Sequence, residues 1–441
     1  MAANLKQIYR IAAGVASIAI IAVASIALTA QLDRSMFSPR ASHPAIDYYG
    51  TSADPISALN QRLRDGGIEL KSDGPLGYLE SVLEALDIDL ESQVALFSRN
   101  SLQSRFIQPD NPRLVFFSDT VVVAAIRGAP LLEVASVDPE KGVIFYTIDQ
   151  ERPPDLPAFA RQDQLCLRCH DSINSLGVPG MLARSVMPSP DGRINPQLGN
   201  FLINHESPFE ERWGGFYVTG RHGGVRHLGN GVVTDPQDEE SIRGNQELTL
   251  ASIAGRMDEG AYLVPSSDIV ALMVFEHQMH MINLLTRYGW EVRYALRSSL
   301  EGNTVVSVVN LINLEDALGE VVDYMLFLNE PEFQAPVSGS SLFSEKFEGR
   351  GPRDEFGRSL RQFDLRRRLM RYPLSYMIYT HAFDGLPVEA RNAIYARLWQ
   401  VLSGIDDDPK YDRLLPEDRQ DIVEILRATK PGIPAYFGAS L

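Results

Sequence analysis

The stretch LVFFSDTVVVAAIRGAPLLEVASVDPEKGVIFYTI, residues 114–148, decides how the first part of the chain folds. It consists of short apolar runs that turn-forming residues separate, such as Gly128-Ala129-Pro130 and residues 138–142. Runs rich in β-branched and aromatic residues, bounded by Gly, Pro and Asp, are typical of antiparallel strands. With the run before it, the stretch predicts strands at Gln93–Phe97, Leu114–Phe117, Val121–Ile126, Leu131–Val137 and Val143–Ile148.

Outside these strands the sequence predicts helices. Around Gly77–Ile88 the residues Leu79, Val82 and Leu83 follow helical spacing, so we expect one helix packed on the sheet. Residues 330–357 are expected to form a long loop. The later helices are expected at Ser266–Tyr288 (ending at Gly289), Pro387–Leu402 and Pro416–Ala428. The predicted fold class is therefore α+β: an antiparallel-sheet N-terminal region, a loop-rich middle and a helical C-terminal region.

The composition limits the classes of function. With 44% hydrophobic and 22% charged residues among 441, the chain is neither disordered nor a polytopic membrane protein. Its 41 Lys+Arg against 57 Asp+Glu give a formal charge of −16. Because a chain this acidic repels polyphosphate, we expect no nucleic-acid partner.

The N-terminus predicts export from a bacterial cytoplasm. Residues Ile11–Ala30 carry no charge and are long enough to span a bilayer as a helix, while Lys6 and Arg10 precede them. The segment fits either an uncleaved anchor or a signal peptide cleaved after Ser25-Ile26-Ala27. We therefore expect the bulk of the chain in the periplasm, tethered to the cytoplasmic membrane by this helix or released if the signal is cleaved.

The only two cysteines stand in the run Cys166-Leu167-Arg168-Cys169-His170. This is the CxxCH signature for covalent haem attachment. Two thiols three residues apart match the two vinyl groups of haem, and the adjacent His170 is placed to ligate the iron as the proximal ligand. The motif predicts one covalently attached haem c. A zinc site would need further ligands, and a structural disulfide across this spacing would be strained.

The motif is similar to that of the c-type cytochromes, and the resemblance implies an electron-transfer protein. It covers only the motif and its neighbourhood, because a small cytochrome c is mostly helical with a Met ligand downstream, whereas here a sheet precedes the motif. The phrases Arg212-Trp213-Gly214-Gly215 and His222-Gly223-Gly224 resemble large uncharacterised single-haem exported bacterial proteins. The resulting regions are 1–35 (signal anchor or signal peptide), 36–152 (α+β), 153–262 (c-type haem-binding) and 263–441 (mainly helical).

The second ligand of the iron would separate an electron carrier from a catalyst. Between Gly214 and Gly231 lie seven glycines, a freedom that a bound macrocycle could suppress. We therefore expect this loop to supply the distal ligand, with His222 as first candidate and His227 as second. Other histidine and methionine candidates near the motif are Met181, Met187 and His205.

Further side chains could serve the haem or stabilise the fold. Trp213, Phe216 and Tyr217 suit either a haem pocket wall or a small aromatic core, and Arg212, Arg221 and Arg226 suit either propionates or solvent. On the helix Ser266–Tyr288, the spacing of Glu276, His277 and His280 permits shared metal ligation, but hydrogen-bonded buried histidines explain it better. The basic run Arg366, Arg367, Arg368 and Arg371 is either a salt-bridged face or a docking site for an acidic partner or lipid head groups.

Three functions follow as hypotheses. The first is an exported mono-haem c-type cytochrome that passes electrons to or from a periplasmic partner protein. The second is a haem enzyme, peroxidase-like or acting on another small molecule, with an open or displaceable sixth position. The third is a scaffold whose CxxCH binds zinc. The sequence carries no recognised catalytic motif, so whether the protein is an enzyme stays open.

Overall fold

The computed structural model describes residues 40–151, 159–235, 237, 248–257, 262–301 and 304–439, without the side chains of 304–313. The predicted export segment Ile11–Ala30 lies outside these ranges. Within them, no helix combines the length and the apolar character that crossing a membrane requires.

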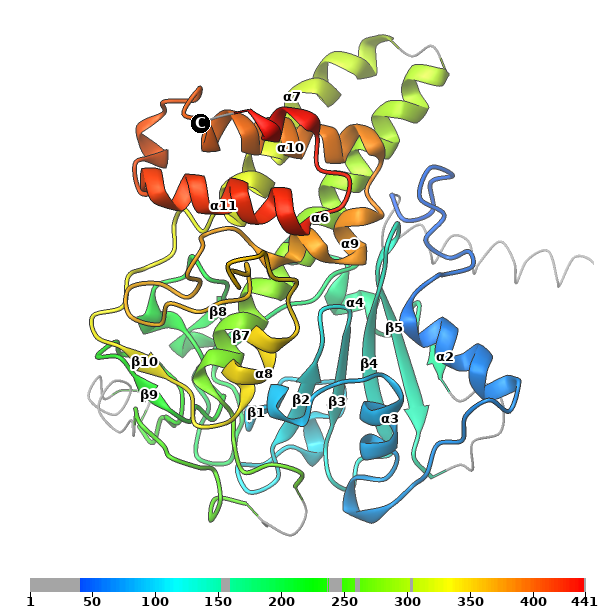
Figure 1. Cartoon of the computed structure of the whole chain (residues 1–441). Helices are drawn as coiled ribbons and strands as arrows, with labels where there is room; N and C mark the ends of the chain where they lie inside the picture. The colour runs from blue at the N-terminus through cyan, green and yellow to red at the C-terminus, as the bar shows by residue number, and fades with distance from the viewer. Residues whose placement is uncertain are drawn as a thin grey trace, which may run out of the picture.

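A six-stranded antiparallel sheet forms the first half of the fold (Figure 1). Its strands neighbour one another in chain order, so short turns suffice to connect most of them. They are β1 (Val94–Leu96), β2 (Arg113–Phe117), β3 (Val121–Ala125), β4 (Leu131–Asp138), β5 (Gly142–Asp149) and β6 (Ala160–Arg161). The apolar runs in the sequence therefore predicted the first five strands to within a residue or two, and the α+β fold class is confirmed.

Two helices precede the sheet in the chain and lie beside it in Figure 1. The predicted helix is α3 (Leu79–Ala85), whereas α2 (Pro55–Arg64) was not expected. Asp54 caps α2, since its Oδ1 accepts from Ile56 N at 2.9 Å. The other carboxylate oxygen of Asp54 accepts from the Tyr146 hydroxyl of β5 at 2.7 Å, which fixes the helix to the sheet.

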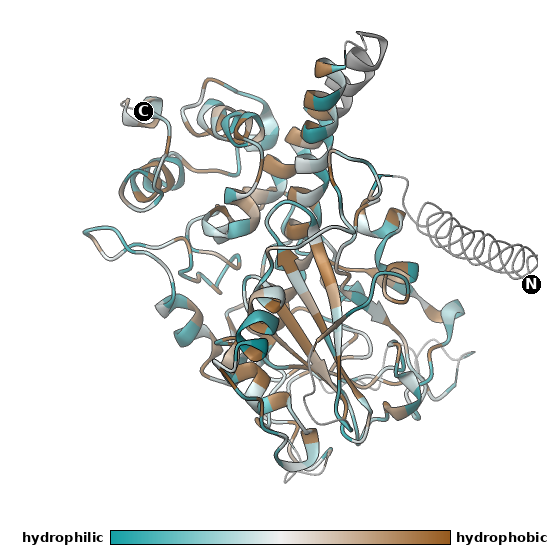
Figure 2. Ribbon diagram, turned by 90° about the vertical axis from the view of Figure 1, so that its right-hand side faces the viewer, coloured by the Kyte–Doolittle hydropathy of each residue, from teal (hydrophilic) through white to brown (hydrophobic). Residues whose placement is uncertain are grey.

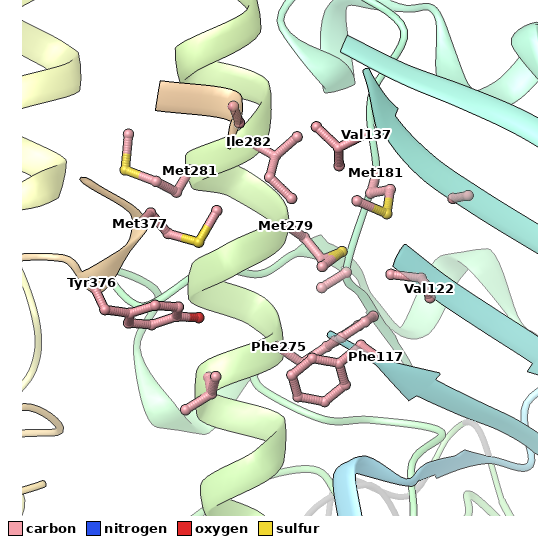
Figure 3. Close-up of a cluster of buried hydrophobic side chains, with 14 of the residues drawn as sticks. Phe117, Val122, Val137, Met181, Phe275, Met279, Met281, Ile282, Tyr376 and Met377 are labelled. Carbon is pink, nitrogen blue, oxygen red and sulfur yellow. The ribbon is translucent and has the colours of Figure 1, made fainter. Parts of the chain in front are cut away.

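Helix α6 (Ile269–Leu300) is the central element of the core. Figure 3 shows Phe275, Met279 and Ile282 on the side of α6 that faces the sheet, and Met281 on the side that faces Met377. The sequence predicted that this helix ends at Gly289, and that is wrong. Gly289 lies inside the helix, where an added Cβ would come within 2.9 Å of Leu386, so the glycine allows close packing.

The remaining helices form the second half of the molecule, at the top of Figure 1. They are α7 (Thr304–Met325), α9 (His381–Asp384), α10 (Val388–Leu402) and α11 (Pro416–Thr429), and α8 (Phe343–Gly349) lies lower. Helices α10 and α11 match their predictions, whereas α7 was not predicted. The long loop expected at 330–357 contains α8 and β10 (Val337–Ser338), so it is partly regular. Short 3₁₀ helices occur at Gly74–Leu76, Leu90–Ser92, Ser104–Phe106, Ile173–Ser175, Pro196–Leu198, Phe209–Glu211, Tyr376–Tyr379, Pro409–Tyr411 and Ala435–Gly438.

The loop-rich middle contains α4 (Leu167–His170), β7 (Arg184–Val186), β8 (Asn200–Leu202) and β9 (Arg221–His222). Strand β7 pairs with β8, and β9 pairs with β10 from the later part of the chain. Glycines let β9 and β10 approach closely. Gly220 has a φ of +115°, and a Cβ there would come within 2.5 Å of the Ser338 carbonyl. The freedom of the glycine-rich segment is thus used for contact with protein backbone.

One hydrophobic core connects all these parts. It includes Val123 of β3, Trp213 of the middle region and Leu398 of α10. Figure 2 shows the hydrophobic residues concentrated in the strands of the sheet, with hydrophilic residues on the outer helices. The region boundaries at 152 and 262 stay predictions.

Candidate functional site

Helix α4 carries the two cysteines on one helical turn. Cys166 begins the turn, and its carbonyl accepts from Cys169 N at 3.1 Å and from His170 N at 3.0 Å. Leu167 is fully buried and anchors the turn in the core. Both thiols are free; Cys166 is half-buried and Cys169 is exposed. Because residues three apart lie on the same face of a helix, the two sulfurs are available to one partner.

The ring of His170 has a fixed orientation. Its Nδ1 lies 2.9 Å from the carbonyl oxygen of Gly180, and a carbonyl only accepts, so Nδ1 is the nitrogen that donates. The ring of Phe145 packs against it at 4.7 Å between centroids. Burial lowers the pKa of His170 below its usual value, which favours the neutral ring. A neutral ring protonated at Nδ1 keeps the lone pair of Nε2 for a ligand.

Charged side chains of the sheet surround the motif. Arg113 Nη2 lies 2.5 Å from Glu133 Oε2, and both residues act electrostatically on Cys166 and His170. Burial, with a smaller contribution from Glu133, raises the pKa of the Cys166 thiol to about 12. Arg184 of β7 also acts on His170. Arg113 and Arg184 are therefore cations that act on the motif in addition to Arg168 within it, and the sequence did not single them out.

Exposed apolar side chains flank the same turn. Leu165 is 42% exposed and Ile173 is 89% exposed, and of residues 161–174 only Leu167 is buried. Leu202, which pairs in register with Arg184, is 39% exposed. Leu165 directly precedes Cys166 and Ile173 follows His170 by three residues, so the chain on both sides of the motif offers apolar surface to a bound apolar group.

The structure does not bring the predicted distal histidines to α4. Figure 1 shows β9, which holds His222, near β10 at the lower left, whereas α4 lies beside β4 and β5. The Nδ1 of His222 interacts with Val225 O at 2.8 Å. Buried His227 uses both ring nitrogens, accepting from Gly229 N and donating to Leu248 O, each at 3.1 Å. Met181 is buried in the apolar layer between α6 and the sheet (Figure 3), and Met187 is buried as well.

A second cluster lies at the centre of the fold, on the helix where the sequence singled out Glu276, His277 and His280. His277 Nδ1 lies 2.6 Å from Nδ1 of His205, and its Nε2 lies 2.8 Å from the Ser375 hydroxyl. The ring of Tyr324 stacks on His205 at 3.9 Å and packs against His280 at 4.8 Å. His205 Nε2 is buried and has no hydrogen-bond partner among the described residues. The sequence did not reveal that His205 and Tyr324 belong to this cluster.

Glu276 completes the cluster with a buried ion pair. Its Oε1 accepts from Arg212 Nη1 at 2.5 Å and its Oε2 from the Trp213 indole at 3.0 Å. Arg212 and Glu276 are 2% and 1% exposed, so neither is available to a propionate. Of the other predicted partners, Arg221 and Arg226 are exposed and lie in the β9 segment. Trp213, Phe216 and Tyr217 belong to the core.

The basic run beyond residue 365 is in part a salt-bridged face. Arg368 Nη2 lies 2.6 Å from Asp418 and also donates to the Arg371 carbonyl at 2.8 Å. Arg366 and Arg367 are exposed.

Side-chain clusters of the kind that bind metal ions were also predicted. Within the ranges that the structure describes, no group of three or more His, Cys, Asp or Glu side chains could hold a metal ion. The prediction of a metal-binding protein is therefore wrong for a centre built from these side chains, which covers the zinc scaffold and shared ligation by Glu276, His277 and His280. Hydrogen-bonded buried histidines, the other interpretation of that helix, agree with the contacts of His277.

No family model, no curated protein and no solved structure matches this chain. The predicted resemblance to the c-type cytochromes is therefore wrong as a statement about family. The fold also differs from the small helical domain of that family, because α4 is a four-residue helix next to a six-stranded sheet. The local chemistry of Cys166, Cys169 and His170 does not depend on family membership, and it can be considered by itself.

Proposed function

We propose that Cys166, Cys169 and His170 attach one haem covalently and that the protein is an exported redox protein. The observation that carries this proposal is the orientation of His170. Its Nδ1 is held by Gly180 O at 2.9 Å, which leaves the lone pair on Nε2, and two free thiols belong to the same turn. Bound haem would supply an iron that changes between two oxidation states, and four of its ligands would come from the porphyrin itself.

The residues present fit this group. Each thiol adds across one vinyl: a C–S bond forms and the thiol hydrogen goes to the vinyl carbon, so no oxidant or reductant is consumed. Both cysteines are free, as this addition requires. The exposed side chains of Leu165 and Ile173 would offer apolar surface to the macrocycle, and the guanidinium of Arg184 would be a cation suited to a propionate.

The function that follows is transfer of electrons to or from a partner protein. The exposed Cys169 supports this proposal, because a group attached there lies at the surface, within reach of a partner. A second function, reaction with a small oxidised substrate, is favoured by the position of the predicted sixth ligands. His222 lies on β9, away from α4, and Met181 lies in the core, so neither residue closes the sixth position in this arrangement.

The experiment is an absorption spectrum of protein produced with a haem-maturation system. We expect a Soret band, sharp bands on reduction, and haem that stays on the polypeptide after acid extraction. Cys166→Ala with Cys169→Ala should abolish attachment, and Ser81→Ala, a serine of α3 whose hydroxyl accepts from Lys71 N at 3.1 Å, serves as the matched control. Complete extraction of haem from wild-type protein would refute the proposal. Binding of carbon monoxide without displacement of a ligand would favour small-molecule chemistry over electron transfer.

We also propose that the described body lies on the periplasmic side of a bacterial cytoplasmic membrane. The support comes from the uncharged residues Ile11–Ala30 behind Lys6 and Arg10. A reporter that is active only in the cytoplasm, fused after residue 441, should be silent. Carbonate washing then separates the two forms of tether, because a cleaved protein is released and an anchored one is retained.

A further inference from the structure

Asn283 of α6 binds the segment that faces His170. Its side chain is 1% exposed and forms two hydrogen bonds with one residue: Oδ1 accepts from Met181 N at 3.0 Å, and Nδ2 donates to Met181 O at 2.7 Å. Gly180 is part of the same contact, because a Cβ added there would overlap Asn283 Oδ1. The amide of Asn283 therefore packs directly on the backbone of residues 180 and 181.

The first of these hydrogen bonds acts on the group that orients His170. Met181 N–H and Gly180 C=O belong to the same peptide unit, which is planar, so its N–H and C=O point in opposite directions. Asn283 holds the N–H end, and the C=O end accepts from His170 Nδ1 at 2.9 Å. Rotation of this peptide plane would break both bonds together. The amide N–H of Gly180 also donates to His170 O at 2.9 Å, which fixes the two backbones relative to each other.

We propose that Asn283 is a positioning residue for His170: it holds the Gly180–Met181 peptide plane so that the Gly180 carbonyl fixes the ring orientation and the Nδ1–H tautomer. This inference rests on the proposed function, since the ring is useful only if its Nε2 ligates the iron. It extends that function from the motif to α6, 113 residues further along the chain (283 minus 170). A hydrogen bond to the other nitrogen of a metal-binding imidazole tunes how strongly the ring donates to the metal.

Three variants separate positioning from packing. Asn283→Leu keeps the size and removes both hydrogen bonds. Asn283→Asp keeps an oxygen that accepts from Met181 N, and burial favours its neutral carboxylic acid, whose hydroxyl can donate to Met181 O in place of Nδ2. Gln278→Leu is the matched control: Gln278 is a buried amide of the same helix, and it bonds Ser118 O and the Tyr376 hydroxyl. In haem-loaded protein, we expect Asn283→Leu to shift the Soret band and the reduction potential. We expect Asn283→Asp and Gln278→Leu to leave both at the wild-type values, although Gln278→Leu loses stability.

A second readout does not need haem. Nitrogen-15 NMR of haem-free protein, with His170 assigned through His170→Gln, should show His170 protonated at Nδ1 in wild type and a mixture of tautomers in Asn283→Leu. A wild-type ring protonated at Nε2 would overturn the proposal even if Asn283→Leu does not fold. Haem-loaded Asn283→Leu with a wild-type spectrum would overturn it as well. If wild type takes up no haem, the proposed function fails, and the NMR result still decides whether Asn283 orients the ring.

Discussion

The two histidine sites of this protein use the same side chain in opposite ways. His170 lies on a half-exposed turn, and one ring nitrogen is held by a carbonyl while the other keeps its lone pair. His277 is fully buried and uses both nitrogens, one toward His205 and one toward Ser375. Tyr324 and Phe327 stack on the ring of His277, at 5.2 and 4.4 Å between centroids.

The difference shows which arrangement suits chemistry and which suits stability. A histidine whose nitrogens are both hydrogen-bonded in the core has no free atom for a ligand, and its loss leaves buried groups without partners. A histidine with one oriented nitrogen and one free nitrogen is arranged as a metal ligand. We therefore expect changes in the buried cluster to alter stability, and changes at α4 to alter cofactor attachment.

Among the predicted changes, Glu276→Leu should cause the largest loss in the free energy of unfolding. The substitution leaves the Arg212 guanidinium, 2% exposed, without its carboxylate. Breaking a buried pair in this way costs about 3–5 kcal/mol. Urea unfolding of the haem-free protein measures the loss.

The matched control for this variant is Glu320→Gln. It breaks the pair that Glu320 forms with Arg287 of α6 at 2.5 Å, where the carboxylate is 51% exposed, and such surface pairs contribute about 0–1 kcal/mol. If the two variants lost equal stability, the contrast between buried and exposed sites would not hold.

His277→Phe should change how stability depends on pH. Burial lowers the pKa of His277 to about 3, below the value of about 6.5 for the unfolded chain. As pH falls, the unfolded chain binds a proton at His277 before the folded protein does, which favours unfolding. The contribution of neutral His277 to the free energy of unfolding is therefore complete above about pH 6.5 and is lost as pH falls toward about 3. The stability difference between wild type and His277→Phe should narrow by about 2 kcal/mol between pH 7 and pH 5. A constant difference in urea unfolding at the two pH values would contradict this.

The sequence predicted the sheet well because its information is local. Apolar runs between turn residues determine β2 to β5, and Pro387 and Gly404 flank α10 as its boundaries. The predicted end of α6 at Gly289 is wrong, because glycine can end a helix but can also lie inside one, where it makes room for Leu386. What distinguishes the two cases is a contact across the fold, and a local pattern does not contain it.

The same distinction between local patterns and contacts across the fold applies to the candidate site. The sequence predicts Cys166, Cys169 and His170 as a site because covalent haem attachment requires close spacing in the chain, and this site stays a prediction. The pair His205–His277 spans 72 residues, and the hydrogen bonds from Asn283 to Met181 span 102, so neither has a sequence signature. From the sequence, we expect a bound macrocycle to restrict the glycine-rich segment. The glycines predict that something packs closely against this backbone, but they do not show what it is. In the structure, backbone near Ser338 packs against this segment.

Cys169→Ser should give the smallest change in stability and the clearest change in attachment. The side chain is exposed, so the free energy of unfolding of haem-free protein should stay within about 0.5 kcal/mol of wild type. Only one thioether remains possible, through Cys166, so one vinyl stays conjugated with the ring and the reduced α band moves to longer wavelength. Ser175→Ala, in the 3₁₀ helix Ile173–Ser175 that follows this turn, tests the opposite case: its buried hydroxyl donates to His170 O at 3.0 Å, so its loss should cost about 1 kcal/mol and leave both thioethers intact. Thermal unfolding and the reduced spectrum are measured for each variant. A Tm of Cys169→Ser well below that of wild type would show that the side chain of Cys169 stabilises the fold. An α band at the wild-type wavelength would show that Cys169 does not form a thioether.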